Sequence, residues 1–402
     1  MRSSHENRKL NLYLGVLFAL TPFSIDLYLS AFREIAADLG TTVARTSLTI
    51  SVYFIGFALG QILYGPFLDR YGRKPPIYVG LIIYILANIG CAWAPTLEVL
   101  LVFRLLSALG GSAATVGALT MVRDFFKGND VPRALSILML VLSTSPLLAP
   151  TIGSMMLHAW GWRILFGVLI VLAVIDLVIV WRLPVGYLPD PAVRLRVGPI
   201  LRTFREIFAQ PQFRTYALSS SLSFAGLFVY VAGSPNVFME GFHLSPRQFG
   251  LVFAFMAGGM ILGSQLNRLL LRRIDGPRLF RRSLTTQAAL SLLFVATAST
   301  TTCSMATTMA FTFSILICCG ITSPNGSALA VLPFHRNVGS ASALFSFLEL
   351  GLGAVVSLFL SVLKIEPILA MSLAIALSSS IAWIILRAST PASNASLGVK
   401  IN

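Results

Sequence analysis

The sequence holds 402 residues, of which 56% are hydrophobic and only 11% are charged. A soluble domain carries roughly 45–50% apolar and about 25% charged residues, and a disordered chain combines low hydrophobicity with high charge, so both classes are excluded. Four cysteines are too few for a disulfide-built secreted scaffold, and the net charge of +15 indicates nucleic acid only if basic residues gather on one folded face.

Apolar runs of about 20 residues, the length that crosses the hydrocarbon core of a bilayer, recur along the chain. They predict about twelve membrane-spanning helices, at 12–31, 46–68, 76–94, 98–121, 132–157, 162–183, 213–235, 248–268, 283–300, 304–332, 338–362 and 366–387. The first run is too long for the apolar core of a signal peptide, is interrupted by Asp26 and lacks a small-residue cleavage site. We therefore interpret it as a retained membrane helix.

A connection of about 30 residues separates the sixth and seventh spans. It predicts an all-α integral membrane protein with two pseudo-symmetric six-helix bundles, residues 1–183 and 213–402, joined by a cytoplasmic linker over 184–212. Shared residues in 57–70 and 255–268 support an internal repeat. In the linker, apolar residues between 200 and 208 share one helical face. This predicts an amphipathic helix that lies either at the lipid surface, with its arginines near anionic headgroups, or on the cytoplasmic loops of the protein.

The basic residues mark the ends of the spans. If the N-terminus is cytoplasmic, 24 of the 30 basic residues fall on the cytoplasmic side and Arg104 falls within a span. Five fall outside, namely Arg33, Arg45, Arg163, Arg247 and Lys364. This asymmetry follows the positive-inside rule with both termini cytoplasmic. Because the basic residues mark membrane topology rather than one folded face, no nucleic-acid partner is predicted.

Four ionisable residues lie inside the predicted spans, where each costs on the order of 2.5–3.5 kcal/mol. Asp26 is a candidate site for a proton or a cationic substrate, or else half of a permanent structural pair. Arg104 needs a partner, for which we expect Asp26, and serves either proton coupling or structure. Glu349 is a candidate second proton or cation site, or a residue that fixes helix packing. Asp176 is expected to pair with Arg182.

Two further motifs suggest moving parts. In the loop after the second span, Gly65, Asp69, Arg70, Gly72 and Arg73 can form a charge network that locks one conformation, whereas the alternative is a solvated basic loop. The fifth span is interrupted by two prolines and a glycine. These residues predict either a hinge facing the opposite half or a passive kink, and they are Pro146, Pro150 and Gly153.

No metal-ligand spacing, phosphate-binding loop or nucleophile motif occurs in the sequence. We therefore predict neither an enzyme nor a cofactor, and any energy would come from an ion gradient or from no source at all. Aromatic residues are candidate walls of a substrate cavity, although packing in the membrane core is their commoner role. They are Tyr28, Tyr53, Phe224, Phe228 and Tyr230.

Several of these segments resemble the major facilitator superfamily. The loop 65–74 (GPFLDRYGRK) is similar to the signature between its second and third helices. Segments 24–29 (SIDLYL), 103–106 (FRLL, followed by Gly110 and Gly111) and 148–153 (LAPTIG) resemble motifs of its twelve-helix drug:proton antiporters. Segments 122–124 (VRD) and 161–163 (GWR) resemble the bicyclomycin/chloramphenicol-resistance (Bcr/CflA) exporters.

The resemblance implies export of drug-like molecules by alternating access, coupled to protons. It assigns proton or substrate coupling to Asp26 and Arg104, the lock to the 65–74 loop and the antiport hinge to Pro150 and Gly153. Ser30, Ser107, Ala149 and Ser154 depart from the family motifs. The implied partners are a small-molecule substrate, protons and lipid, with a monomer in the bacterial inner membrane.

Two alternatives remain open at this stage. The chain is either an uptake carrier for a metabolite, proton-coupled or facilitated, or a membrane receptor that transports nothing. Direction of flux and its dependence on a proton gradient distinguish them from drug export.

Overall fold

The computed structural model describes residues 4–127, 130–184, 197–300, 303–334, 338–362 and 365–389. No strand occurs in these segments. Part of the predicted linker, residues 185–196, lies outside the described residues. So do residues 1–3 and 390–402 at the two termini.

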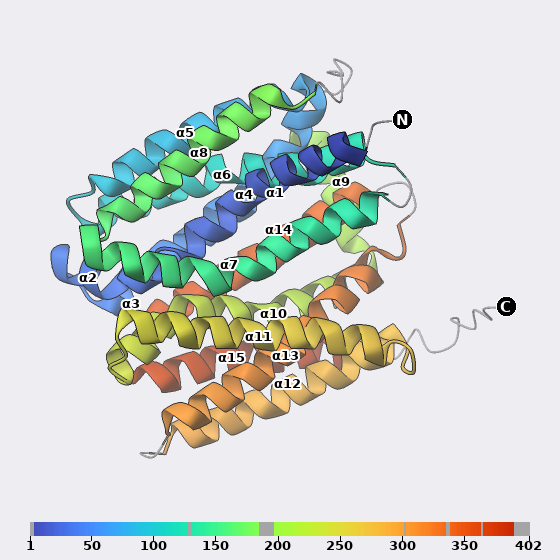
Figure 1. Ribbon diagram of the computed structural model, residues 1–402. Helices are drawn as coiled ribbons and strands as arrows, with labels where there is room; N and C mark the ends of the chain where they lie inside the picture. Colours follow the sequence, from blue (N-terminus) through green and yellow to red (C-terminus); the bar gives the residue numbers. More distant parts are fainter. Residues whose placement is uncertain are drawn as a thin grey trace. The chain divides into compact units, whose positions relative to one another are not determined.

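Helices account for nearly all of the described chain (Figure 1). Up to residue 182 they are α1 (Ser4–Asp26), η1 (Leu29–Ala31), α2 (Phe32–Asp38), α3 (Val43–Thr46), α4 (Leu48–Tyr71), α5 (Lys74–Ala92), α6 (Leu97–Phe125), α7 (Asp130–Trp160) and α8 (Arg163–Arg182). The remainder are α9 (Val197–Ala209), α10 (Pro211–Ser234), the π-helix η2 (Pro235–Gly241), α11 (Pro246–Leu270), α12 (Gly276–Ala298), α13 (Met305–Val331), α14 (Val338–Val362) and α15 (Pro367–Ala388).

The chain packs as two compact units. The first comprises Met1–Arg196 with Val231–Ala257, and the second comprises Val197–Tyr230 with Gly258–Asn402. The first unit thus takes in a segment that the sequence assigns to the second bundle. The division into bundles of residues 1–183 and 213–402 remains a prediction.

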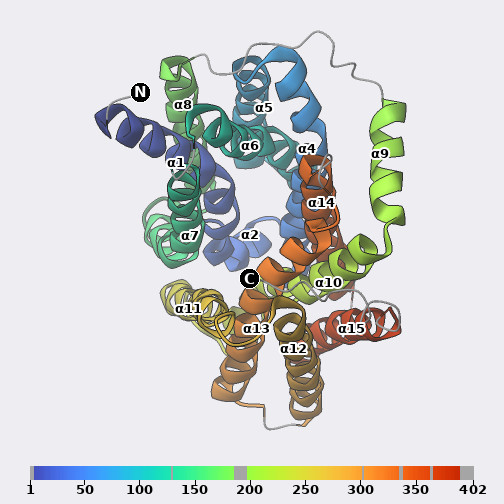
Figure 2. The same cartoon turned by 90° about the vertical axis from the view of Figure 1, so that its right-hand side faces the viewer.

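Eleven of the described helical stretches are long and apolar enough to cross a membrane, which confirms the all-α membrane fold. The predicted span 283–300 is not among the eleven. It coincides with α12, whose first half carries Arg278, Arg281 and Arg282 together with Thr285 and Gln287. This helix packs between α13 and α15 within the second unit (Figure 2).

Polar contacts join neighbouring helices of the first unit at each of their two ends. At one end, Arg45 pairs with Glu98 at 3.4 Å and Arg163 with Asp38 at 2.6 Å. At the other, Lys74 Nζ donates to the carbonyl of Trp181 at 3.1 Å. The charge pattern predicts the first end outside and the second inside, and this orientation remains a prediction.

The amphipathic helix predicted in the linker is α9. Part of its apolar face packs on protein, since Ile207 is buried with Phe213 and Phe345 while Phe204 and Phe208 pack against the same cluster. Leu201 of that face is 59% exposed. For the part around Ile207, packing on the protein rather than immersion in lipid is the alternative that the structure supports. Its arginines, Arg202 and Arg205, are exposed.

A buried amide joins the helices of the second unit. Gln287 of α12 donates to the Ser223 carbonyl at 2.9 Å and to Ser379 Oγ at 3.3 Å, and it accepts from Ser223 Oγ at 2.6 Å. Ser223 Oγ also contacts Thr322 Oγ1 at 2.8 Å. These bonds link α10, α12, α13 and α15. Gln287, one of the polar residues of α12, therefore also holds this helix in the bundle.

We expect Gln287→Ala to lower the thermal unfolding temperature of the solubilised protein, because it removes the buried hydrogen bonds that join α12 to α10 and α15, each worth roughly 0.5–1.5 kcal/mol. Gln265→Ala, at an exposed position of α11, is the matched control and should leave the temperature unchanged. Equal melting temperatures for wild type and Gln287→Ala would contradict this account.

Candidate transport site

Arg104 is completely buried in α6 and has no carboxylate partner in the described chain. Its Nη2 donates to the carbonyl of Ser24 at 3.1 Å. The guanidinium carbon lies 4.7 Å from the centre of the Tyr28 ring and 4.3 Å from that of Tyr53. A desolvated cation over two aromatic faces gains roughly 2 kcal/mol or more per favourable contact. The two tyrosines therefore compensate part of the cost of burying the charge.

Asp26 ends α1, and the chain then tightens into the short helix η1. The carboxyl group is 6% exposed, and Ser145 Oγ of α7 donates a hydrogen bond to its Oδ2 at 2.9 Å. The expected ion pair with Arg104 is not formed, so that expectation is wrong for this conformation. The reason is geometric, because the guanidinium binds the carbonyl of Ser24, two residues before Asp26, and is flanked by tyrosine rings.

Hydroxyl groups surround this acid and base in the first unit. Thr21 and Thr115 are bonded at 2.8 Å, and Tyr28 donates to Thr49 at 2.6 Å. The Ser24 hydroxyl is bonded to that of Tyr84. The hydroxyls of α1, α4, α5 and α6 thus form a buried polar layer around the helix that carries Asp26.

The other two acids inside the spans have different surroundings. Asp176 of α8 is 1% exposed, and neither carboxylate oxygen has a hydrogen-bond partner among the described residues. The expected pair with Arg182 is wrong, since that side chain is exposed at the end of α8. Glu349 of α14 is half-buried, and Ser323 of α13 donates to it at 3.0 Å.

Both prolines of the predicted hinge lie within the continuous helix α7. Gly153, one turn after Pro150, faces the Leu27 carbonyl so closely that a Cβ atom would overlap it, and that Cβ would lie 3.0 Å from Ser30 Oγ. A Cβ on Gly250 of α11 would lie 3.5 Å from Pro150. Gly153 therefore allows α7 to pack directly against the turn that follows Asp26.

The predicted cavity aromatics are mostly packed. Tyr28 and Tyr53 are fully buried beside Arg104. Phe228 and Tyr230 of α10 are also buried, and Phe224 is half-buried with its ring edge against Phe228 at 5.5 Å. Their role as substrate walls remains a prediction.

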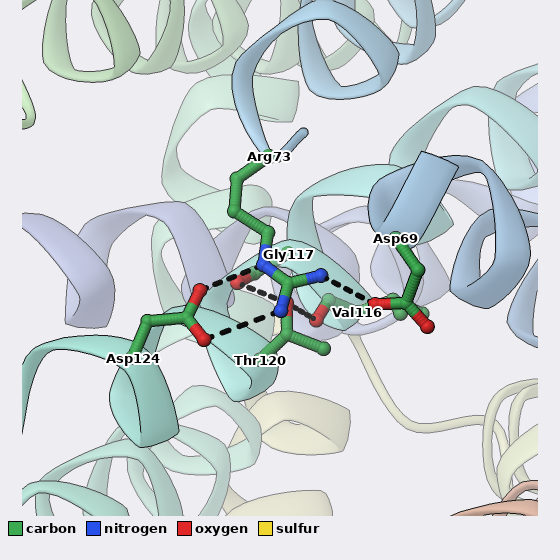
Figure 3. A network of polar contacts seen from close by, with 6 residues as sticks. All are labelled: Asp69, Arg73, Val116, Gly117, Thr120 and Asp124. Carbon is green, nitrogen blue, oxygen red and sulfur yellow. Dashed lines mark hydrogen bonds and ion pairs between the residues drawn. The ribbon is translucent and has the colours of Figure 1, made fainter. Parts of the chain in front are cut away.

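The predicted lock forms around Arg73, as Figure 3 shows. Its Nε and Nη2 donate to the two oxygens of Asp124 at 2.7 and 3.2 Å, and its Nη1 donates to Asp69 at 2.8 Å. Burial acts to lower the pKa of Arg73, but the bonds to Asp124 and Asp69 outweigh it and raise the pKa above its usual value. The network ties the α4–α5 junction to the end of α6.

The other residues of this loop have separate roles in the geometry. Gly72 has a φ of 81°, in the region that favours glycine, and it ends α4. A Cβ on Gly65 would meet nothing within 4 Å. The guanidinium of Arg70 lies over the Tyr71 ring at 5.6 Å.

Comparison with known proteins identifies the family. Residues 14–358 match the family model described as Major Facilitator Superfamily. The chain belongs to the Major Facilitator Superfamily. It is a multi-pass membrane transporter, as the family and the eleven apolar helices indicate, and not an enzyme.

Individual relatives agree with this assignment. The chain is 30% identical to "Uncharacterized MFS-type transporter YdgK" of Bacillus subtilis, over 88% of each chain. It is 27% identical to "Bicyclomycin resistance protein homolog" of Haemophilus influenzae, over 88% of this chain and 89% of the relative. A D-xylose–proton symporter structure superposes with a TM-score of 0.73 at 14% identity, covering 96% and 99% of the two chains, which shows the superfamily fold alone.

Sequence reasoning missed two partners in this superfamily member. Ser145, which holds Asp26, precedes Pro146 in an apolar run where a serine has no special signal. Asp124, the bidentate partner of Arg73, lies in the 122–124 segment (VRD), which the sequence does not connect to the lock. Both contacts join residues far apart in sequence, so only helix packing reveals them.

We expect Arg73→Lys to increase hydrogen–deuterium exchange at residues 69–74, because lysine keeps the charge but cannot bind two carboxylates with a planar fork. Arg133→Lys, in an exposed pair with Asp130 at 3.4 Å, is the matched control and should leave exchange at 69–74 unchanged. Unchanged protection in Arg73→Lys would show that the network does not hold this junction.

We expect Gly153→Ala to destabilise the protein by about 1–3 kcal/mol, because the added methyl group has a backbone carbonyl in its way. Gly258→Ala in α11, where a Cβ meets nothing within 4 Å, should be neutral or slightly stabilising. Denaturant unfolding of the two variants measures the difference, and equal stabilities would refute close packing at Gly153.

Proposed function

We propose that the protein exports drug-like small molecules and draws the energy from inward proton movement. The observation that carries the proposal is the unpaired state of Asp26 and Arg104, which lie on neighbouring helices of one buried layer. Asp26 is held by Ser145, while Arg104 is held by the Ser24 carbonyl and two tyrosine rings. An acid and a base that lie on two packed helices without forming an ion pair can exchange hydrogen-bond partners.

In the proposed cycle, Asp26 alternates between a protonated and an ionised form. Protonated Asp26 remains with the Ser145 hydroxyl. When the substrate binds, Asp26 loses its proton, and the attraction of Arg104 for the new carboxylate draws the start of η1 toward α6. Because Gly153 packs against the backbone that follows Asp26, this movement is transmitted to α7.

Drug-like substrates are supported by the relatives. One of them is named as a bicyclomycin resistance protein homolog and aligns over 88% of this chain. The segments 24–29, 103–106 and 148–153 resemble the antiporter motifs, and each lies in the first unit at or beside this layer. In this proposal Glu349, held by Ser323 in the second unit, is a second position that binds a proton or a cationic substrate.

The proposed setting is a bacterial inner membrane, with both termini cytoplasmic and the transporter acting as a monomer. The proton gradient serves in place of a nucleotide, and no cofactor takes part. The lock around Arg73 would close the cytoplasmic end of the first unit in one conformation and release it in another.

Everted vesicles with an imposed proton gradient test the coupling. We expect drug addition to release protons from wild-type vesicles, and we expect Asp26→Asn to abolish both this release and gradient-driven drug accumulation because amides do not ionise. Asp130→Asn, at an exposed acid of α7, should behave as wild type. Normal accumulation by Asp26→Asn would overturn the proposal, and substrate movement in the opposite direction would indicate uptake.

A further inference from the structure

An apolar groove lies on the surface of the first unit beside the lock. It has a volume of about 470 Å³ and opens between α4 and α5, with Leu109 of α6 at its base. Its walls are entirely apolar or aromatic and comprise Leu63, Tyr64, Phe67, Tyr71, Pro75, Pro76, Val79 and Ile83. No Asp, Glu, Lys, Arg or His side chain is among these wall residues, so the groove suits a hydrocarbon chain rather than a polar ligand.

The groove faces outward. Leu63 is 50% exposed and Val79 is 55% exposed, and both belong to helices that qualify as membrane spans. In a chain that spans a bilayer, apolar side chains exposed on such helices meet lipid instead of water. A lipid acyl chain is therefore the molecule that this surface meets at high concentration.

One end of the groove is positively charged. Tyr71 in its wall stacks on Phe67 at 6.1 Å, and the guanidinium of Arg70 lies over the same Tyr71 ring at 5.6 Å. Lys74, which opens α5 next to Pro75, donates to the Trp181 carbonyl at 3.1 Å. A continuous path of contacts thus leads from the apolar wall to a cation.

Basic side chains outnumber acidic ones at this end. Asp69 and Asp124 both bind Arg73. Among the described residues around this junction, the two acids are set against Arg70, Arg73, Lys74 and the exposed Arg123, so the net charge of the six is positive. A phosphate group attached to the chain in the groove would meet complementary charge, because juxtamembrane basic residues attract anionic lipid.

We propose that this groove binds one anionic phospholipid of the cytoplasmic leaflet. An acyl chain occupies the space between α4 and α5, and the phosphate binds Arg70 and Lys74. The lipid then touches the α4–α5 junction, which Arg73 ties to α6. Its occupancy favours the conformation in which this junction has the present geometry.

Native mass spectrometry of the solubilised full chain tests the proposal. The protein is titrated in parallel with phosphatidylglycerol and with phosphatidylcholine of the same acyl chains. We expect about tenfold preferential retention of phosphatidylglycerol by wild type. Val79→Trp, which fills the groove, should weaken retention of both lipids, whereas Arg70→Gln combined with Lys74→Gln should remove the preference alone.

Each variant has a matched control. Leu86→Trp places the same side chain two turns further along α5, at a residue that is 62% exposed and outside the groove, and Arg133→Gln removes an exposed charge from α7. Both should bind lipid as wild type does. Equal retention of the two lipids by wild type, or wild-type retention in correctly folded Val79→Trp and Arg70→Gln/Lys74→Gln proteins, would overturn the proposal, with the melting temperature as the check on folding.

Discussion

The hydrocarbon core of a bilayer contains no water, so a polar group inside it can be stabilised only by partners within the protein. Arg104 is the strongest case, because its charge is permanent and its side chain is fully buried. Three other helices and the turn that follows α1 contribute to its environment. The Ser24 carbonyl of α1 accepts its hydrogen bond, Tyr28 follows α1, Tyr53 lies on α4, and Tyr84 of α5 is bonded to Ser24. The first unit is therefore organised around one buried cation.

The same constraint bears on the surroundings of Asp26. Its carboxyl group has a hydroxyl partner on α7, and the guanidinium of Arg104 donates to the Ser24 carbonyl instead of to Asp26. Neither arrangement is a permanent ion pair, which would hold the helices in one state. The proposed coupling uses this balance, since protonation decides which of two partners is preferred. In the proposed coupling, Gly153 transmits the movement to α7, because it places α7 against the chain that follows Asp26.

Sequence reasoning identified the fold class, the apolar helices and the residues of greatest interest, because membrane spans and charges inside them leave direct signals in composition. The ordered glycines, acid and bases of the 65–74 loop predicted one charge network for Asp69 and Arg73, and the two residues do pair. It did not identify Ser145 as the partner of Asp26, which lies 119 residues away. It expected Asp26–Arg104 and Asp176–Arg182 pairs from proximity in sequence or along a shared cavity. Helix rotation, which a single sequence does not encode legibly, decides such contacts.

The second unit shows the same limit in another form. Gln287 and the neighbouring threonines reduce the apolar signal of α12, although the packed helix satisfies Gln287 through Ser223 and Ser379. A polar residue that is satisfied by its neighbours is indistinguishable, in sequence alone, from one that faces water. Partner hydroxyls on two other helices, α10 and α15, make the difference.

The central claim is that Asp26 exchanges a proton as substrate binds. Difference infrared spectroscopy of the reconstituted protein, recorded before and after drug addition, observes the C=O band of a protonated carboxylic acid directly. The account predicts a loss of this band when drug binds to wild type and no such loss in Asp26→Asn. An identical loss in both proteins, or a band that drug does not change in wild type, would contradict it.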